Sequence, residues 1–138
     1  MKARFAANID QLHEMLAWIR EQVVQVKFDR TQLHQIELAS EEVLVNIIHH
    51  GYQGRPEQIE IQVDAFQDSH VEICVRDSGP PFNPMEESLS DLTSDLEDRE
   101  IGGLGIHFIR KLMDEVRYQR EGNLNVLVLV KKIGRSFH

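Results

Sequence analysis

The sequence predicts an α+β fold, a two-layer sandwich in which helices cover one face of a largely antiparallel sheet. Three observations support this. Two segments before residue 52 carry apolar residues at helical spacing, and four later segments alternate apolar with polar residues. A third helical segment separates the two pairs of alternating segments. Short turns within each pair favour antiparallel hairpins, and helices that share one face of such a sheet form two layers. The 138 residues are expected to form a single domain, residues 1–138.

The N-terminal part predicts one short strand followed by two helices. Residues 2–7 are expected to form an edge strand. From Asp10 to about Val26 apolar residues recur with the spacing of one helix face, at Leu12, Met15, Leu16, Ile19 and Val23. The next helix is expected to begin near Asp29, with Gln32 as its capping-box partner, and to have Gly51 as the residue just past its end.

The remaining elements follow from alternation and turn residues. The expected order is a strand, a strand, a helix and two further strands, at residues 59–65, 71–75, 104–114, 116–120 and 124–131. Residues 67–69 and 121–123 are expected to form the turns of two hairpins.

Composition and charge exclude several classes of protein. The longest apolar stretch, residues 124–130, is too short to cross a bilayer, and no secretory signal is expected at Met1–Phe5, so the cytoplasm is the expected location. The net charge of −8 argues against direct nucleic-acid binding and favours a basic protein partner. Cys74 is alone and is expected to be a small buried residue of a strand.

The long segment from residue 78 to 101 is unusual for a compact domain. A loop of this length without periodicity is usually a lid over a ligand or a disordered segment. It is rich in acidic residues, and Pro81 stiffens its beginning. We expect a lid over a ligand, with a solvated acidic loop as the alternative.

Glu42 and Asn46 lie four residues apart on the second predicted helix, which places them on one stripe of its surface. An amide oxygen can hold a hard cation, and a neighbouring carboxylate can act on water or a hydroxyl group. Asparagine is mildly unfavourable within a helix, which favours a functional reason for Asn46. The alternative is that both residues belong to a solvated helix face.

Two further segments complete the set. Asp77 ends a predicted strand and Gly79 follows it, so the carboxylate can accept a hydrogen bond from an exocyclic amine while the glycine lets a flat ring approach. The run Gly102, Gly103, Leu104 and Gly105 precedes a helix, where exposed N–H groups and the helix dipole suit phosphate. An ordinary turn and a flexible hinge are the respective alternatives.

In their order along the chain, the three segments resemble the N, G1 and G2 boxes of the GHKL, or histidine-kinase-like, ATPase superfamily. The closest resemblance is to the anti-sigma factor serine kinases, and it covers nearly the whole chain. It implies the Bergerat ATP-binding fold with ATP and Mg²⁺. It also implies that Asn46 holds Mg²⁺, that Glu42 is the general base and that Asp77 recognises adenine beside Gly79. The run from Gly102 through Gly103 and Leu104 to Gly105 would form the phosphate-side turn.

The same resemblance implies a function. Such a protein sequesters an RNA polymerase sigma factor and phosphorylates a serine of an anti-sigma factor antagonist of the STAS type, commonly as a homodimer. A non-catalytic binder that switches partners with nucleotide is the alternative, favoured by the acidic lid. The ATPase portion of a sensor histidine kinase is a further alternative, for which His13 would be the phosphoacceptor.

Overall fold

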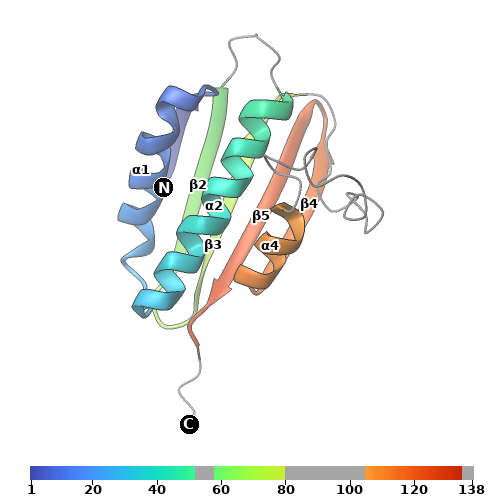
Figure 1. Ribbon diagram of the computed structural model, residues 1–138. Coiled ribbons are helices and arrows are strands. Elements are labelled where there is room, and N and C mark those ends of the chain that lie inside the picture. Colours follow the sequence, from blue (N-terminus) through green and yellow to red (C-terminus); the bar gives the residue numbers. More distant parts are fainter. Residues whose placement is uncertain (52–57, 80–104, 135–138) are drawn as a thin grey trace.

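The computed structural model describes residues 1–51, 58–79 and 105–134, and they form a sheet covered on one face by helices (Figure 1). The sheet has five strands in the order β1-β2-β3-β5-β4, and every neighbouring pair is antiparallel. The strands are β1 (Lys2–Ala6), β2 (Gln58–Phe66), β3 (His70–Asp77), β4 (Glu115–Glu121) and β5 (Leu124–Lys132). The predicted fold class and the predicted edge strand at the N-terminus are confirmed.

The helices begin and end close to the predicted positions, with two corrections. They are η1 (Ile9–Gln11), α1 (Leu12–Val23), α2 (Arg30–Gly51) and α4 (Gly105–Leu112). The first predicted helix ends at Val23, not near Val26, because the N–H of Val26 bonds to the carbonyl of Val23 at 3.0 Å in a tighter turn. Val26 is nevertheless buried, and this explains why an apolar residue there extends the helical spacing beyond the end of the helix. Gly51 is the last residue of α2 and does not follow it.

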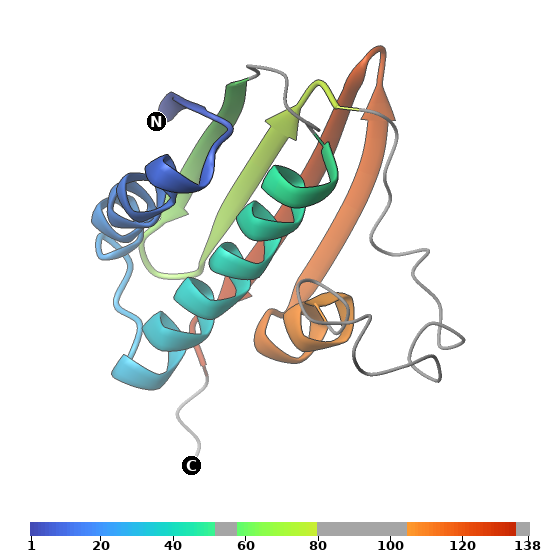
Figure 2. The same cartoon turned by 45° about the horizontal axis from the view of Figure 1, so that its top comes forward.

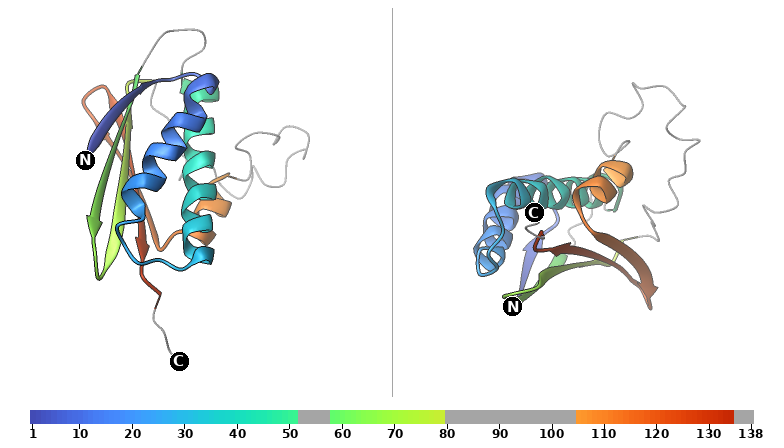
Figure 3. Two further views of the ribbon diagram at one scale, coloured as in Figure 1. Left: turned by 90° about the vertical axis from the view of Figure 1, so that its left-hand side faces the viewer. Right: turned by 90° about the horizontal axis from the view of Figure 1, so that it is seen from below.

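In the described part of the chain, helices α1, α2 and α4 lie side by side on the same face of the sheet, with α2 between α1 and α4 (Figure 3). Arg20 of α1 joins Glu37 of α2 through two hydrogen bonds, of 2.8 and 2.6 Å. None of the helices in the described ranges combines the length and apolar composition that a bilayer crossing requires.

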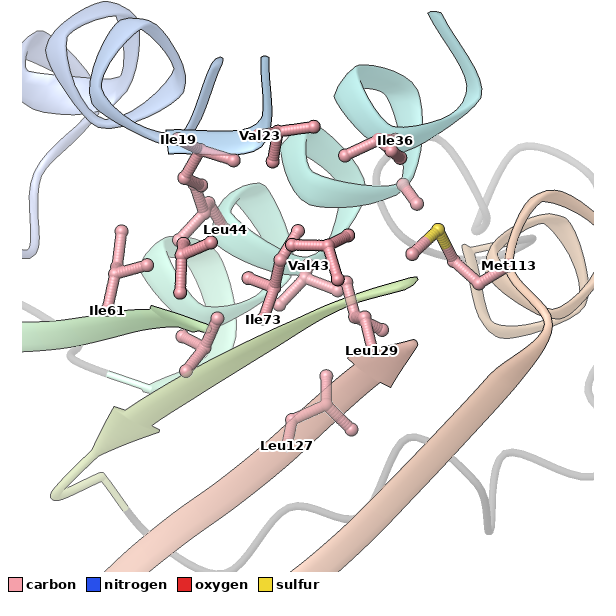
Figure 4. Close-up of a cluster of buried hydrophobic side chains, with 14 of the residues drawn as sticks. Ile19, Val23, Ile36, Val43, Leu44, Ile61, Ile73, Met113, Leu127 and Leu129 are labelled. Carbon is pink, nitrogen blue, oxygen red and sulfur yellow. The ribbon is translucent and has the colours of Figure 1, made fainter. Parts of the chain in front are cut away.

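The core lies between the helix layer and the sheet (Figure 4). Ile73 and Leu129, at the centre of the sheet, are completely buried, as is Leu44 of α2. Burying one such side chain contributes roughly 1.5–3 kcal/mol relative to leaving it exposed. The core therefore fixes how the C-terminal half of α2 lies over the strands.

The side chains of Gln32 and Lys131 attach helix ends to the sheet. Asp29 and Gln32 form the predicted capping box at the start of α2, with reciprocal bonds of 2.7 and 3.1 Å, and Gln32 also donates to the carbonyl of Lys132. Lys131 is buried and its Nζ donates to the carbonyl of Leu112, the last residue of α4. A lysine at this point satisfies an orphan carbonyl and complements the helix dipole.

Candidate functional site

Glu42 and Asn46, the helix pair, lie on the side of α2 that faces α4. Glu37 faces α1 through Arg20, and Asn46 is nine residues further along, a rotation of roughly 180° around the helix. Since α4 lies on the opposite side of α2 from α1, the helix pair is turned towards α4 (Figure 3).

The helix pair presents two buried oxygen atoms without a hydrogen-bond partner in the described part of the chain. Asn46 is only 5% exposed, and both its Oδ1 and the Oε2 of Glu42 are enclosed without a donor. Burial raises the pKa of the Glu42 carboxyl, and the charge of Glu41 raises it further. A buried acceptor without a partner is costly, so two on one helix stripe indicate a place prepared for a ligand.

Asp77 lies at the end of β3 and points to the helix side of the sheet. It follows the buried Ile73 and Val75 in the alternation of β3, and it is 5% exposed. The sheet register places Asn125 of β5 directly opposite. Asn125 Nδ2 donates to Asp77 Oδ1 at 3.1 Å, and the N–H of Gly79 donates to the same oxygen at 3.0 Å.

Two residues of β4 extend this network. Tyr118 donates its hydroxyl hydrogen to Asn125 Oδ1 at 2.5 Å, and Arg120 Nη1 donates to the same oxygen at 3.1 Å. Arg120 Nη1 also donates to the carbonyl of Gly79 at 3.0 Å. Asp77, Gly79, Tyr118, Arg120 and Asn125 are called the strand-end cluster below.

Sequence reasoning identified Asp77 and Gly79 of this cluster and missed the other three. The available signal was Asn125, a polar residue inside the apolar run of residues 124–130. Tyr118 and Arg120 share one face of β4 by alternation, yet only the register of the sheet shows that this face meets Asn125.

The C-terminal end of α2, which follows Asn46, and the strand-end cluster lie towards the same end of the molecule, while Glu42 lies near the middle of α2. The C-terminal half of α2 lies over the end of β3, on the helix side of the sheet towards which Asp77 points (Figures 1 and 2). Gly105 is the first residue of α4. Gly102, Gly103 and Leu104, together with residues 80–101 of the expected lid, which include Pro81, lie outside the described residues.

The chemistry of the site suits a ligand that carries both cationic charge and hydrogen-bond donors. Asn46 Oδ1 is a neutral hard oxygen of the kind that Mg²⁺ accepts as a ligand, so the residue could hold a divalent cation. The described residues contain no group of three or more His, Cys, Asp and Glu side chains gathered as a metal site.

Comparisons with known proteins assign the class. Residues 5–131 match the histidine kinase-like ATPase domain family. The chain is 30% identical over 102 residues to an anti-sigma F factor of Halalkalibacterium halodurans, covering 73% of this chain and 69% of that protein. It is 25% identical over 117 residues to the serine/threonine-protein kinase BtrW of Bordetella bronchiseptica, covering 84% and 82%.

Solved structures show the same fold. The RsbU and RsbW domains of a Mycobacterium tuberculosis protein superpose with a TM-score of 0.63 at 17% identity, covering 98% of this chain and 33% of that one. The mycobacterial sensor histidine kinase MprB gives a TM-score of 0.53 at 15% identity, covering 96% and 97%.

The fold thus defines a two-layer domain of a nucleotide-binding class, in which α2 carries the helix pair and the sheet carries the strand-end cluster. This chain belongs to the histidine kinase-like ATPase domain family, which matches it along nearly its whole length.

Proposed function

We propose that this protein is an ATP-binding anti-sigma regulatory factor with protein serine kinase activity. It would sequester a sigma factor and phosphorylate an anti-sigma factor antagonist. The observation that carries the proposal is the helix pair, whose two buried oxygens have no donor in the described part of the chain. The names of the relatives, an anti-sigma F factor and a serine/threonine-protein kinase, support this function.

The helix pair would serve the phosphate end of the nucleotide. Asn46 Oδ1 would be a ligand of Mg²⁺, and the ion would neutralise charge on the triphosphate when bound. Glu42, with its pKa raised by burial, is a stronger base than an exposed glutamate and would accept the proton of the attacking serine hydroxyl. The serine oxygen would bond to the γ-phosphorus as the bond to the ADP oxygen breaks.

The strand-end cluster would serve the base of the nucleotide. Asp77 would accept a hydrogen bond from the adenine amino group, and Gly79 would allow the ring to lie against the backbone. Gly102, Gly103, Leu104 and Gly105 would form the turn on the phosphate side, because N–H groups at the start of α4 favour anions. Residues 78–101 would form the lid, and residues 1–138 one domain.

The partners are proposed from charge and from the relatives. A net charge of −8 favours a basic segment of a sigma factor over nucleic acid. The antagonist would be a STAS-type protein carrying the acceptor serine. A homodimer in the cytoplasm is the proposed state, with β1 and α1 at the interface because β1 is an edge strand.

The test is phosphoryl transfer with a charge-matched control. The protein is incubated with Mg-ATP and candidate antagonists from the same genome, and acid-stable phosphoserine is measured. Glu42→Gln is expected to keep ATP binding and to lower transfer by about 10²–10⁴-fold, the usual contribution of a general base. Glu41→Gln removes the same charge from the neighbouring exposed residue and should keep most of the transfer, because burial is the main cause of the raised pKa of Glu42.

The other outcomes decide among the alternatives. ATP binding without transfer to any antagonist would favour the partner-switching binder, because a protein that only binds its partners needs no catalytic base. Acid-labile label on His13 would favour a histidine kinase portion. Absence of ATP binding by the purified protein would refute the proposal itself.

A further inference from the structure

We propose that Arg120 and Tyr118 are positioning residues that make the nucleotide site selective for a base with an exocyclic amino group. This inference rests on the proposed function, because it concerns the base-binding part of the same site. Neither residue needs to touch the base. They act through Asn125 and Gly79, which hold Asp77.

The orientation of the Asn125 amide is fixed by two donors. Its Oδ1 accepts from Tyr118 and from Arg120, at 2.5 and 3.1 Å. A guanidinium group has donors only, so it cannot face the amide nitrogen. The reversed amide would also set a carbonyl oxygen against the Asp77 carboxylate. Arg120 and Tyr118 therefore keep Asn125 Nδ2 directed at Asp77.

The two carboxylate oxygens of Asp77 are engaged differently. Oδ1 accepts from Asn125 Nδ2 and from the N–H of Gly79, at 3.1 and 3.0 Å. Within the described residues no hydrogen bond reaches Oδ2. The strand-end cluster thus engages one carboxylate oxygen twice and leaves the other as an acceptor.

The Arg120 side chain reaches two backbone carbonyl groups. Its Nε donates to the carbonyl of Gly122, in the β4–β5 turn, at 3.3 Å. Its Nη1 donates to the carbonyl of Gly79, in the turn after β3, at 3.0 Å. Arg120 therefore fastens the backbone after Asp77 to the β4–β5 hairpin, although the residue itself is exposed.

Selectivity follows from the remaining acceptor. A carboxylate oxygen pairs with an amino group, as in adenine, and is left without a donor by a base that presents a carbonyl or a hydrogen at the same place. Sites built around a buried hydrogen bond reject analogues that lack it, because the protein group is then unpaired. If Arg120 is lost, Asn125 and the backbone at Gly79 are held less firmly, so the position of the Asp77 carboxylate is less fixed and this discrimination weakens.

The experiment compares ATP with purine riboside triphosphate, which lacks only the amino group, by calorimetry with Mg²⁺ present. The wild-type protein is expected to bind ATP about ten-fold or more tightly than the analogue. In Arg120→Met the ratio should fall to about three-fold or less, chiefly through weaker ATP binding. Arg120→Lys retains the charge without the planar fork and should show the same loss of ratio.

The control is Arg117→Met, the same change on the opposite face of β4, where Arg117 pairs with Glu115. It should keep the wild-type ratio. If Arg120 acted only by attracting the triphosphate or by stabilising the fold, both nucleotides would weaken equally, and an unchanged ratio would overturn the inference.

Tyr118→Phe removes one hydroxyl group from the same amide and should also lower the ratio, which keeps the test decisive if an Arg120 variant does not fold. A wild-type protein that bound neither nucleotide would refute the proposed function. Normal ATP binding with a ratio insensitive to Arg120 and Tyr118 would refute the positioning role alone.

Discussion

Replacing Asn46 by leucine is expected to stabilise the protein in the absence of nucleotide while abolishing the binding of Mg-ATP. Most substitutions of buried residues destabilise a protein, so the predicted sign is unusual. It follows from the structure, because the Oδ1 of Asn46 is enclosed at 5% exposure without a donor in the described ranges. Leucine has nearly the same shape and no polar atom to leave unpaired.

The magnitude can be worked out from two contributions. Removing a buried acceptor without a partner recovers about 1–3 kcal/mol of desolvation free energy. Leucine is also the better helix former, by roughly 0.5 kcal/mol within a helix such as α2. Partial repacking reduces the sum, so an increase of about 1–3 kcal/mol in the free energy of unfolding is expected. For a domain of this size, each kcal/mol raises Tm by about 3–5 °C.

The assay is thermal and urea unfolding of both proteins, with and without Mg-ATP. Ligand binding to the folded state raises Tm by mass action, so the wild-type protein should gain stability with Mg-ATP and Asn46→Leu should not. Ser40→Ala is the matched control, since the Ser40 hydroxyl is also buried without a partner in the described residues but is not assigned to the site. It should raise Tm and keep the response to nucleotide.

A lower Tm for Asn46→Leu without nucleotide would refute this reasoning. It would mean that Asn46 makes a stabilising interaction in the protein without nucleotide, so that its amide oxygen is not an unpaired acceptor that a ligand would satisfy.

Three further predictions follow from the same structure. Burial raises the pKa of Glu42 in the folded protein. The protonated carboxyl group therefore contributes fully to stability below the pKa that Glu42 has in the unfolded chain, and this contribution is lost as the pH rises through the pKa of the folded state. Glu42→Gln should therefore raise Tm at pH 8 and leave it nearly unchanged at pH 4, as thermal melts at both pH values would show. Lys131→Met should lower the free energy of unfolding by about 1–3 kcal/mol in urea titrations, because the carbonyl of Leu112 loses its donor. Removal of Mg²⁺ with EDTA should reduce the Tm increase caused by ATP in the wild-type protein, and an equal increase without the ion would contradict a metal at Asn46.

The sequence predicted those parts of the fold that depend on neighbours along the chain. The capping box of Asp29 and Gln32 spans three residues and was confirmed by both of its hydrogen bonds. The alternation in β2 and β3 was confirmed because a one-residue shift would expose the whole apolar set, including Ile61 and Ile73. Local pattern and tertiary packing agree in these elements, so local reasoning was sufficient.

The strand-end cluster was only partly predictable, because it depends on pairing between distant strands. Asp77 and Asn125 are 48 residues apart in the chain and meet through the register of β3 and β5. From the sequence, Arg120 is expected to be an ordinary exposed residue of a hairpin. Only the structure shows that it donates to the carbonyl groups of Gly122 and Gly79. The length of the first helix was overestimated for a different reason. Val26 is apolar because it is buried, and it therefore continued the apolar pattern although it lies beyond the end of the helix.

The division of the site between two layers has a consequence for kinetics. The strand-end cluster lies on the sheet, and in the proposed function it would contact the base of the nucleotide, which does not change during phosphoryl transfer. Binding energy gained there is equal in the ground state and the transition state, so its loss should raise KM and leave kcat nearly constant. The helix pair lies on α2, and in the proposed function its carboxylate would act only as the proton leaves the serine, so its loss should lower kcat. Since one core joins α2 to the strands, both groups are held in a fixed relation, and substitutions in the two layers should separate binding of the base from transfer of the phosphoryl group.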